Sequence, residues 1–159
     1  MATLDTKHIE AIAAFIHTSA EDAHPMFEAQ SNPFWESLRE VGTELWLDTG
    51  DIEAAEQQWC SEMSALTTNN TLLNKEIQKG IYDSLITEAA GAVGDLPREQ
   101  QIMEIAFILN AHHGLRLVQR FGGMVSVELH TDLSHDLDGI VSYGQRFHDI
   151  SPDHFIVKV

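Results

Sequence analysis

The sequence ELWLDTGD at residues 44–51 contains the signal that decides the fold. Its first half is a short, mainly apolar run, and the Asp-Thr-Gly-Asp after it has the composition of a turn. The carboxylate of Asp51 can cap a helix that continues to about residue 58. The segment therefore predicts a strand, a tight turn and a helix in succession, which is the repeating unit of a parallel α/β fold.

The same unit recurs towards the C-terminus. Further strands are predicted at residues 64–66, 124–129 and 155–159, and the segments between them predict helices at 71–79, 81–90, 97–122 and 135–148. Strands that alternate with helices form parallel sheets with right-handed crossovers. We therefore predict an α/β fold with about four parallel strands, which corresponds to part of a (β/α)8 TIM barrel.

Two regions are expected along the chain. Residues 1–43 should form an N-terminal helical extension, because Ile9, Ile12 and Ile16 recur at helical spacing. Residues 44–159 should form the first half of a barrel. The sequence stops inside the apolar strand 155–159, and a complete barrel takes roughly 250 residues. We therefore expect a truncation after the fourth strand.

The chain is strongly acidic, with nine Lys and Arg residues against 25 Asp and Glu residues and a formal net charge of −16. Such a charge repels phosphates, so neither nucleic acid nor an anionic membrane is expected as a partner. No apolar run is long enough to span a bilayer. The single cysteine, Cys60, cannot form an internal disulfide, which indicates a reducing, cytoplasmic location.

The histidines do not suggest a metal site. His130, His135 and His148 lack the spacing typical of zinc ligands. His112 and His113 are adjacent in a predicted helix and should point to different helix faces. We therefore expect them to have packing roles, and no bound metal is expected.

Three of the predicted strands carry a charged residue near the C-terminal end: Asp48, Glu128 and Lys158. Parallel barrel strands bring these ends to one rim, where active sites of this architecture lie. An uncharged lysine there can attack a ketone and form a Schiff base, while carboxylates on other strands move protons. The ordinary interpretations are a surface lysine, a turn aspartate and a glutamate that only forms an ion pair.

Four segments carry a resemblance to a known family. LWLDTGD at residues 45–51, TTN at 67–69, VSVEL at 125–129 and FIVKV at 155–159 resemble four successive strand regions of transaldolases and the related fructose-6-phosphate aldolases. Their order and approximate spacing agree with the family across residues 44–159. The resemblance therefore implies the first half of a TIM barrel and a transaldolase-type enzyme.

The resemblance also implies roles for individual residues in a class I mechanism that needs no metal or organic cofactor. Lys158 would form the Schiff base, Asp48 would act as the acid/base on the sugar hydroxyl, and Glu128 would relay protons through water. Asn69 would hydrogen-bond substrate hydroxyls, and Thr67 would support the loop after the second strand.

The implied reaction belongs to the pentose phosphate pathway. In transaldolases a dihydroxyacetone unit passes from a ketose phosphate, such as sedoheptulose 7-phosphate, to an aldose phosphate, such as glyceraldehyde 3-phosphate. Glu128 favours transfer over cleavage, because the aldolases carry Gln at the corresponding position. A fructose-6-phosphate aldolase and a non-catalytic half barrel that pairs with a partner chain are the alternatives.

The chain departs from the family pattern in two ways. Proline usually follows Thr-Thr-Asn, whereas this chain has Asn70, which removes the bias that proline places on the geometry of Asn69. The phosphate-binding Arg and Ser residues of the family follow the lysine strand, beyond Val159. We therefore expect little or no activity from this chain alone. Its expected partner is the missing C-terminal half of the barrel or a second copy.

Overall fold

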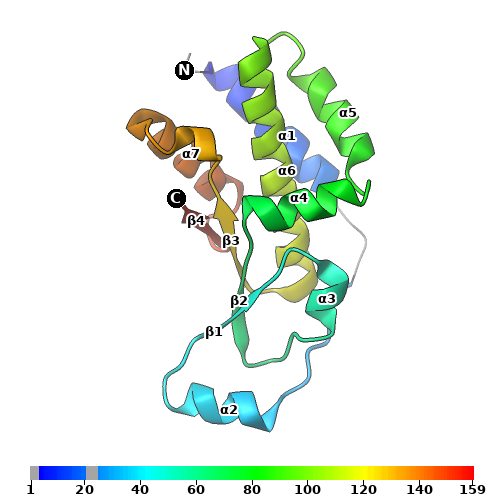
Figure 1. The fold of residues 1–159 in the computed structure, drawn as a ribbon, viewed down its shortest axis with the longest axis vertical. Helices are drawn as coiled ribbons and strands as arrows, with labels where there is room; N and C mark the ends of the chain where they lie inside the picture. The colour runs from blue at the N-terminus through cyan, green and yellow to red at the C-terminus, as the bar shows by residue number, and fades with distance from the viewer. Residues whose placement is uncertain (1–3, 21–24) are drawn as a thin grey trace.

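The computed structural model describes residues 4–20 and 25–159 of the chain. Its centre is a single parallel sheet whose four strands follow chain order (Figure 1). These strands are β1 (Leu45–Asp48), β2 (Met63–Thr67), β3 (Met124–Glu128) and β4 (Phe155–Lys158). The predicted α/β class and the four parallel strands of a partial barrel are confirmed.

Helices precede the sheet and connect its strands. They are α1 (Thr6–Ala20), α2 (Pro33–Glu40), α3 (Ile52–Glu56), α4 (Asn70–Gln78), α5 (Asp83–Ala92), α6 (Arg98–Phe121) and α7 (Leu137–Ile150). A 3-10 helix at Thr131–Leu133, which the sequence analysis missed, follows β3. Within the described ranges, no helix has both the length and the apolar character needed to cross a bilayer. Residues 1–3 and 21–24, which fall in the expected N-terminal extension, lie outside the described residues.

Short polar side chains cap several of these helices, among them α2 and α3. The side-chain oxygen of Asn32 accepts the N–H of Phe34 at 3.0 Å, and the next residue, Pro33, opens α2. The carboxylate of Asp51 accepts the N–H of Ala54 at 3.0 Å and caps α3, as predicted. Each cap satisfies an N–H group that has no partner inside its own helix. The caps therefore fix where α2 and α3 begin.

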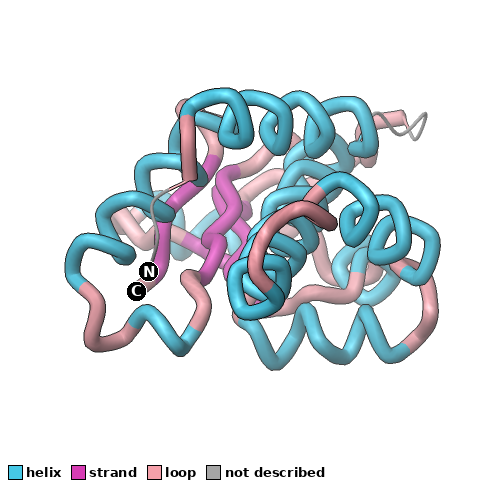
Figure 2. The backbone as a smooth tube through the Cα atoms, turned by 90° about the horizontal axis from the view of Figure 1, so that it is seen from above, coloured by secondary structure: helices cyan, strands magenta, loops and turns pink. Residues whose placement is uncertain are grey.

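The two faces of the sheet differ in exposure. Leu66, Val125 and Val127 are fully buried on the face that the helices cover. On the opposite face the side chains of Trp46 and Met124 are 47% and 40% exposed. Seen from above, the strands lie at the centre with helices packed around them (Figure 2). We call the less covered side the open face of the sheet. It corresponds to the inner face of a barrel.

Helix α6 approaches the covered face closely at Gly114. A Cβ atom on Gly114 would lie 2.8 Å from the ring of Phe155 and 2.9 Å from a methyl carbon of Val127. Carbon atoms in contact prefer about 3.5–4.0 Å. Because glycine lacks this atom, α6 can sit directly on β3 and β4.

A buried ion pair joins α6 to α7. The carboxylate of Glu104, which is fully buried, accepts hydrogen bonds from both terminal nitrogens of Arg146, at 3.0 and 2.5 Å. The hydroxyl of Tyr143 donates a third bond at 2.6 Å, and the guanidinium lies 4.1 Å from the ring centre of Phe107. Two buried charges are costly unless their hydrogen bonds are satisfied. Here both oxygens have partners, so the pair holds the two helices in one orientation.

Replacing Glu104 by Gln should destabilise the fold strongly. The substitution keeps the shape of the side chain but leaves the Arg146 guanidinium buried without a counter-charge. We expect the free energy of unfolding, measured by urea denaturation, to fall by about 3 kcal/mol. The matched control is E10Q, because Glu10 is exposed on α1 and should change stability by less than about 0.5 kcal/mol. Equal effects of the two substitutions would contradict a structural role for the buried pair.

Candidate active site

Parallel pairing places the predicted site residues on one face of the sheet. Thr67 pairs with Asp48 on one side and with Ser126 on the other, and Glu128 pairs with Lys158. Paired residues point to the same face, and side chains two residues apart on a strand also share a face. Asp48, Thr67, Glu128 and Lys158 therefore all lie on the open face, near the C-terminal ends of the four strands.

Glu128 and Lys158 are in direct contact. The Nζ atom of Lys158 lies 3.2 Å from Oε1 of Glu128 and donates a hydrogen bond of 3.3 Å to the backbone oxygen of Thr68. The Lys158 side chain is 39% exposed and the Glu128 side chain 22%. The amine is thus held at the rim, where a substrate can reach it. The structure brings these two residues together, and their catalytic roles stay predictions.

Asp48 lies across the open face from this pair. It is exposed at the end of β1, and β2 separates it from β3. At ordinary strand spacing, β1 lies roughly 10 Å from β3 and roughly 14 Å from β4 along the sheet. Asp48 therefore lies on the same face of the sheet as Glu128 and Lys158, two and three strands away from them.

The loop after β2 is shaped by its own polar groups. The side-chain oxygen of Asn69 accepts the N–H of Leu72 at 2.9 Å and caps α4. Because the cap uses the carbonyl oxygen, hydrogen bonding to a substrate hydroxyl would fall to the amide nitrogen of Asn69. The backbone oxygen of Thr67 accepts the N–H of Thr49 at 3.1 Å. This bond ties the loop after β2 to the loop after β1.

Two asparagines that the sequence analysis did not assign to the site hold Glu128. The backbone N–H of Asn70 donates to Oε2 of Glu128 at 2.8 Å. The side chain of Asn110, which is buried on α6, donates to the backbone oxygen of Glu128 at 2.8 Å. The sequence offered one indication that Asn110 has a polar partner: it is a polar residue next to the apolar stripe of a long helix. No local pattern indicated the bond from Asn70.

Comparison with known proteins identifies the family. The family model described as Transaldolase/Fructose-6-phosphate aldolase matches residues 45–159, a range that contains all four strands. The chain belongs to this family. The resemblance that was inferred from the four sequence segments is thereby confirmed.

Curated transaldolases are among the relatives of this family member. The transaldolase of Nostoc punctiforme is 35% identical over 112 residues, which are 67% of this chain and 32% of that protein. The transaldolase of Edwardsiella ictaluri is 31% identical over 133 residues, which are 77% of this chain and 40% of that protein. For the transaldolase of Rattus norvegicus the identity is 29% over 125 residues, with shares of 74% and 36%. The chain thus spans between 32% and 40% of the length of these three relatives.

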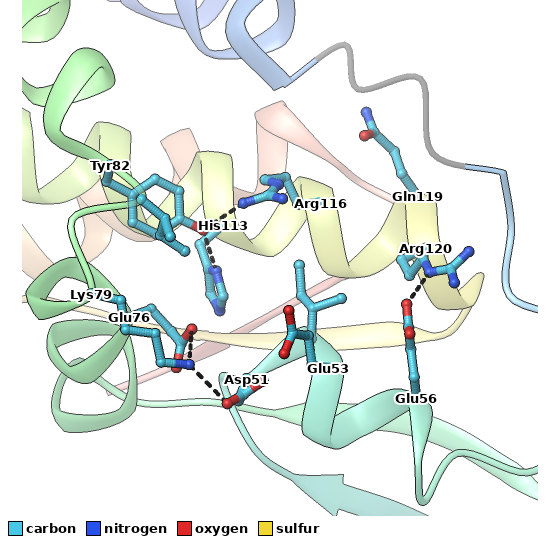
Figure 3. Close-up of a pocket in the computed structure, with 12 residues that line it drawn as sticks. Asp51, Glu53, Glu56, Glu76, Lys79, Tyr82, His113, Arg116, Gln119 and Arg120 are labelled. Atoms are coloured by element: carbon cyan, nitrogen blue, oxygen red, sulfur yellow. Dashed lines mark hydrogen bonds and ion pairs between the residues drawn. The ribbon is translucent and has the colours of Figure 1, made fainter.

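This transaldolase-family chain also has a cavity of about 610 Å³ between α3, α4 and α6 (Figure 3). None of the five predicted site residues lines it. Several of its charged side chains form ion pairs: Lys79 lies 2.8 Å from both Asp51 and Glu76, and Arg120 lies 2.6 Å from Glu56. The hydrogen bond from Lys79 also holds the pKa of Asp51 below its usual range. These contacts stabilise the surrounding helices, and the cavity is separate from the candidate site.

The imidazole of His113 is buried in the wall of this cavity. Arg116 donates to the hydroxyl of Tyr82 at 3.3 Å, and that hydroxyl forms a hydrogen bond of 2.7 Å with Nδ1 of His113 (Figure 3). Burial, with a smaller contribution from the charge of Arg116, lowers the pKa of His113 to about 3. The ring is therefore neutral at physiological pH, and its burial confirms the expected packing role.

A neutral His113 should make the fold sensitive to acid. Its pKa in the folded chain lies below the ordinary value of 6.5, so the unfolded chain binds the proton first. The stability that is present above pH 6.5 is then lost as the pH falls towards 3. In NMR spectra at about pH 5 the ring of His113 should still be neutral, and it should titrate near 6.5 after unfolding in urea. A midpoint near 6.5 in the folded chain would contradict this prediction.

The part of the chain that the structure describes has no cluster of metal-ligating side chains, and its cysteine is buried. Among residues 4–20 and 25–159, no group of three or more His, Cys, Asp or Glu side chains could hold a metal ion. Cys60 is buried, and this burial raises the pKa of its thiol. Because the thiolate is the nucleophilic form, Cys60 is poorly suited to covalent chemistry.

Proposed function

We propose that this chain carries the Schiff-base part of a transaldolase site, which transfers a dihydroxyacetone unit between sugar phosphates. The observation that carries the proposal is the contact between Lys158 and Glu128 on the open face, in a member of the transaldolase/fructose-6-phosphate aldolase family. The relatives named as transaldolases support transfer as the reaction. The proposal includes a role in the pentose phosphate pathway and, because Cys60 has no cysteine to pair with, a cytoplasmic location.

The proposed reaction begins when the uncharged Nζ of Lys158 attacks the carbonyl carbon of a ketose. The resulting carbinolamine loses water: Glu128, which has taken a proton from the Lys158 ammonium, supplies it to the departing oxygen directly or through a water molecule. The iminium then accepts the electron pair as the neighbouring carbon–carbon bond breaks, while Asp48 takes the hydroxyl proton of the departing aldose. Addition of a second aldose to the bound three-carbon unit, followed by hydrolysis, completes the transfer.

Phosphate binding is the part of this reaction that the chain supports least. Lys158 is the only Lys or Arg in the four strands, and it is already paired with Glu128. Phosphate groups are usually held by positive side chains or by helix N-termini. We therefore propose that the chain alone binds sugar phosphates weakly and turns over slowly. Schiff-base formation with a small uncharged ketone needs no such group and should be retained.

The open face supports a second element of the proposal. Trp46 and Met124 are exposed there, and no other described strand lies beside the outer edges of β1 and β4. Exposed strand edges favour pairing with further strands. We propose that the C-terminal half of the barrel, or a second copy of this chain, covers this face. A non-catalytic half barrel, in which such pairing is the whole role, is the second candidate function.

Borohydride reduction in the presence of dihydroxyacetone tests the Schiff base. The wild-type chain should gain the mass of one reduced three-carbon adduct, which peptide mapping should assign to Lys158, and K158A should gain none. The matched control is K75A, because Lys75 is exposed on α4 and its loss should leave labelling unchanged. No adduct in the wild type, or equal labelling of K158A, would rule out the catalytic role and leave the half barrel as the candidate.

Transfer and simple cleavage differ in their need for an acceptor. With sedoheptulose 7-phosphate as donor and the chain at high concentration, we expect ketose consumption to rise several-fold when glyceraldehyde 3-phosphate is added. Chromatography of the products measures this, with K158A as the blank. Release of free dihydroxyacetone at the same rate without acceptor would instead support a fructose-6-phosphate aldolase type of reaction.

A further inference from the structure

The contacts of Glu128 point to a further residue with a role in the proposed reaction. Oε1 of Glu128 faces the amine of Lys158 at 3.2 Å, and Oε2 accepts the backbone N–H of Asn70 at 2.8 Å. We propose that Asn70 is a positioning residue whose backbone N–H fixes the Glu128 carboxylate with its other oxygen towards Lys158. The inference rests on the proposed function and extends it by one residue.

The N–H of Asn70 is available because Asn70 is the first residue of α4. The first four N–H groups of a helix have no partner inside that helix. The side chain of Asn69 satisfies the N–H of Leu72, and Glu128 satisfies the N–H of Asn70. The partial positive charge at the start of the helix also favours a carboxylate at this place. The side chain of Asn69 thus caps the helix, whereas the backbone of Asn70 binds a residue of the candidate site.

The side chain of Asn70 fixes the position of its own backbone. Its amide nitrogen donates to the backbone oxygen of Leu129 at 2.9 Å, and its oxygen accepts a bond of 3.3 Å from the side chain of Asn110. Asn110, which is 4% exposed, also donates to the backbone oxygen of Glu128. The start of α4, the end of β3 and the middle of α6 are therefore joined around Glu128.

This arrangement leaves only one oxygen of Glu128 for proton exchange at the amine. A carboxylate that could rotate freely would face Lys158 for only part of the time, and orientation of a catalytic group has a large effect on rate. The step that should depend on this orientation is the loss of water from the carbinolamine, because that step needs a proton at the departing oxygen. Binding of the ketose should not depend on it.

Proline and alanine at position 70 separate the backbone donor from the side chain. Asn70→Pro removes the N–H, and proline is well tolerated at the first position of a helix. Asn69 has φ −154° and ψ 170°, an extended conformation that suits the residue before a proline. Asn70→Ala keeps the N–H and removes only the side-chain bonds. The difference between N70P and N70A therefore isolates the bond to Glu128.

The experiment measures the rate of single-turnover borohydride trapping with dihydroxyacetone, over a range of ketone concentrations. We expect N70A to lie within about threefold of the wild type and N70P to be about tenfold slower, the loss of one hydrogen bond to a charged group. The concentration for half-maximal trapping should stay the same. In an E128A background N70P and N70A should trap at equal rates, since no carboxylate is left to position.

A second measurement tests the contact without relying on activity. The amide of Asn70 should exchange with solvent about tenfold faster in E128A than in the wild type, as followed by NMR. An unchanged exchange rate of the Asn70 amide would contradict the hydrogen bond between Asn70 and Glu128. Equal trapping by N70P and N70A, or a difference between them that persists in E128A, would overturn the positioning role alone. Absence of any adduct in the wild type would overturn the proposed function and this inference together.

Discussion

Glu128 and Lys158 meet because β3 and β4 pair in one particular parallel register. A shift of one residue in either strand would turn its charged side chain towards the helices and bring an apolar one to the open face. Val125, Val127 and Phe155 oppose that shift, because they are buried against the helices. The burial of these three side chains therefore sets the distance between an amine and a carboxylate on the other side of the sheet.

Helix α6 connects the core to the candidate site. Near its start, the buried pair between Glu104 and Arg146 fixes α7, the helix that leads into β4. In its middle, Asn110 holds the backbone at Glu128. Charge is arranged differently on the two sides of the sheet. Behind the sheet the pair of Glu104 and Arg146 is buried and serves the fold, whereas the pair of Glu128 and Lys158 at the rim is partly exposed.

Local signals explain what could be predicted from the sequence. The strands and most helices were found because apolar runs, caps and turns are encoded by neighbouring residues, as with Asp51 at the start of α3. Their places near the C-terminal ends of parallel strands were enough to predict that Asp48, Glu128 and Lys158 lie at one rim. The bond between Asn70 and Glu128 spans 58 positions, and no local pattern encodes it. The same holds for Glu104 and Arg146, which are 42 positions apart. The 3-10 helix was missed because it is a single short turn, and the polar loop around it gave no periodic signal.

The close packing of α6 on the sheet at Gly114 connects the helix-covered face to the candidate site at the rim. Gly114 lies about one turn along the helix from Asn110. A methyl group there would force the helix away from β3 and β4 or displace the ring of Phe155. Because a helix moves as a stiff rod, Asn110 would withdraw from Glu128 with it. The orientation of the Glu128 carboxylate on the open face thus depends on the absence of a Cβ atom at Gly114, on the other side of the sheet.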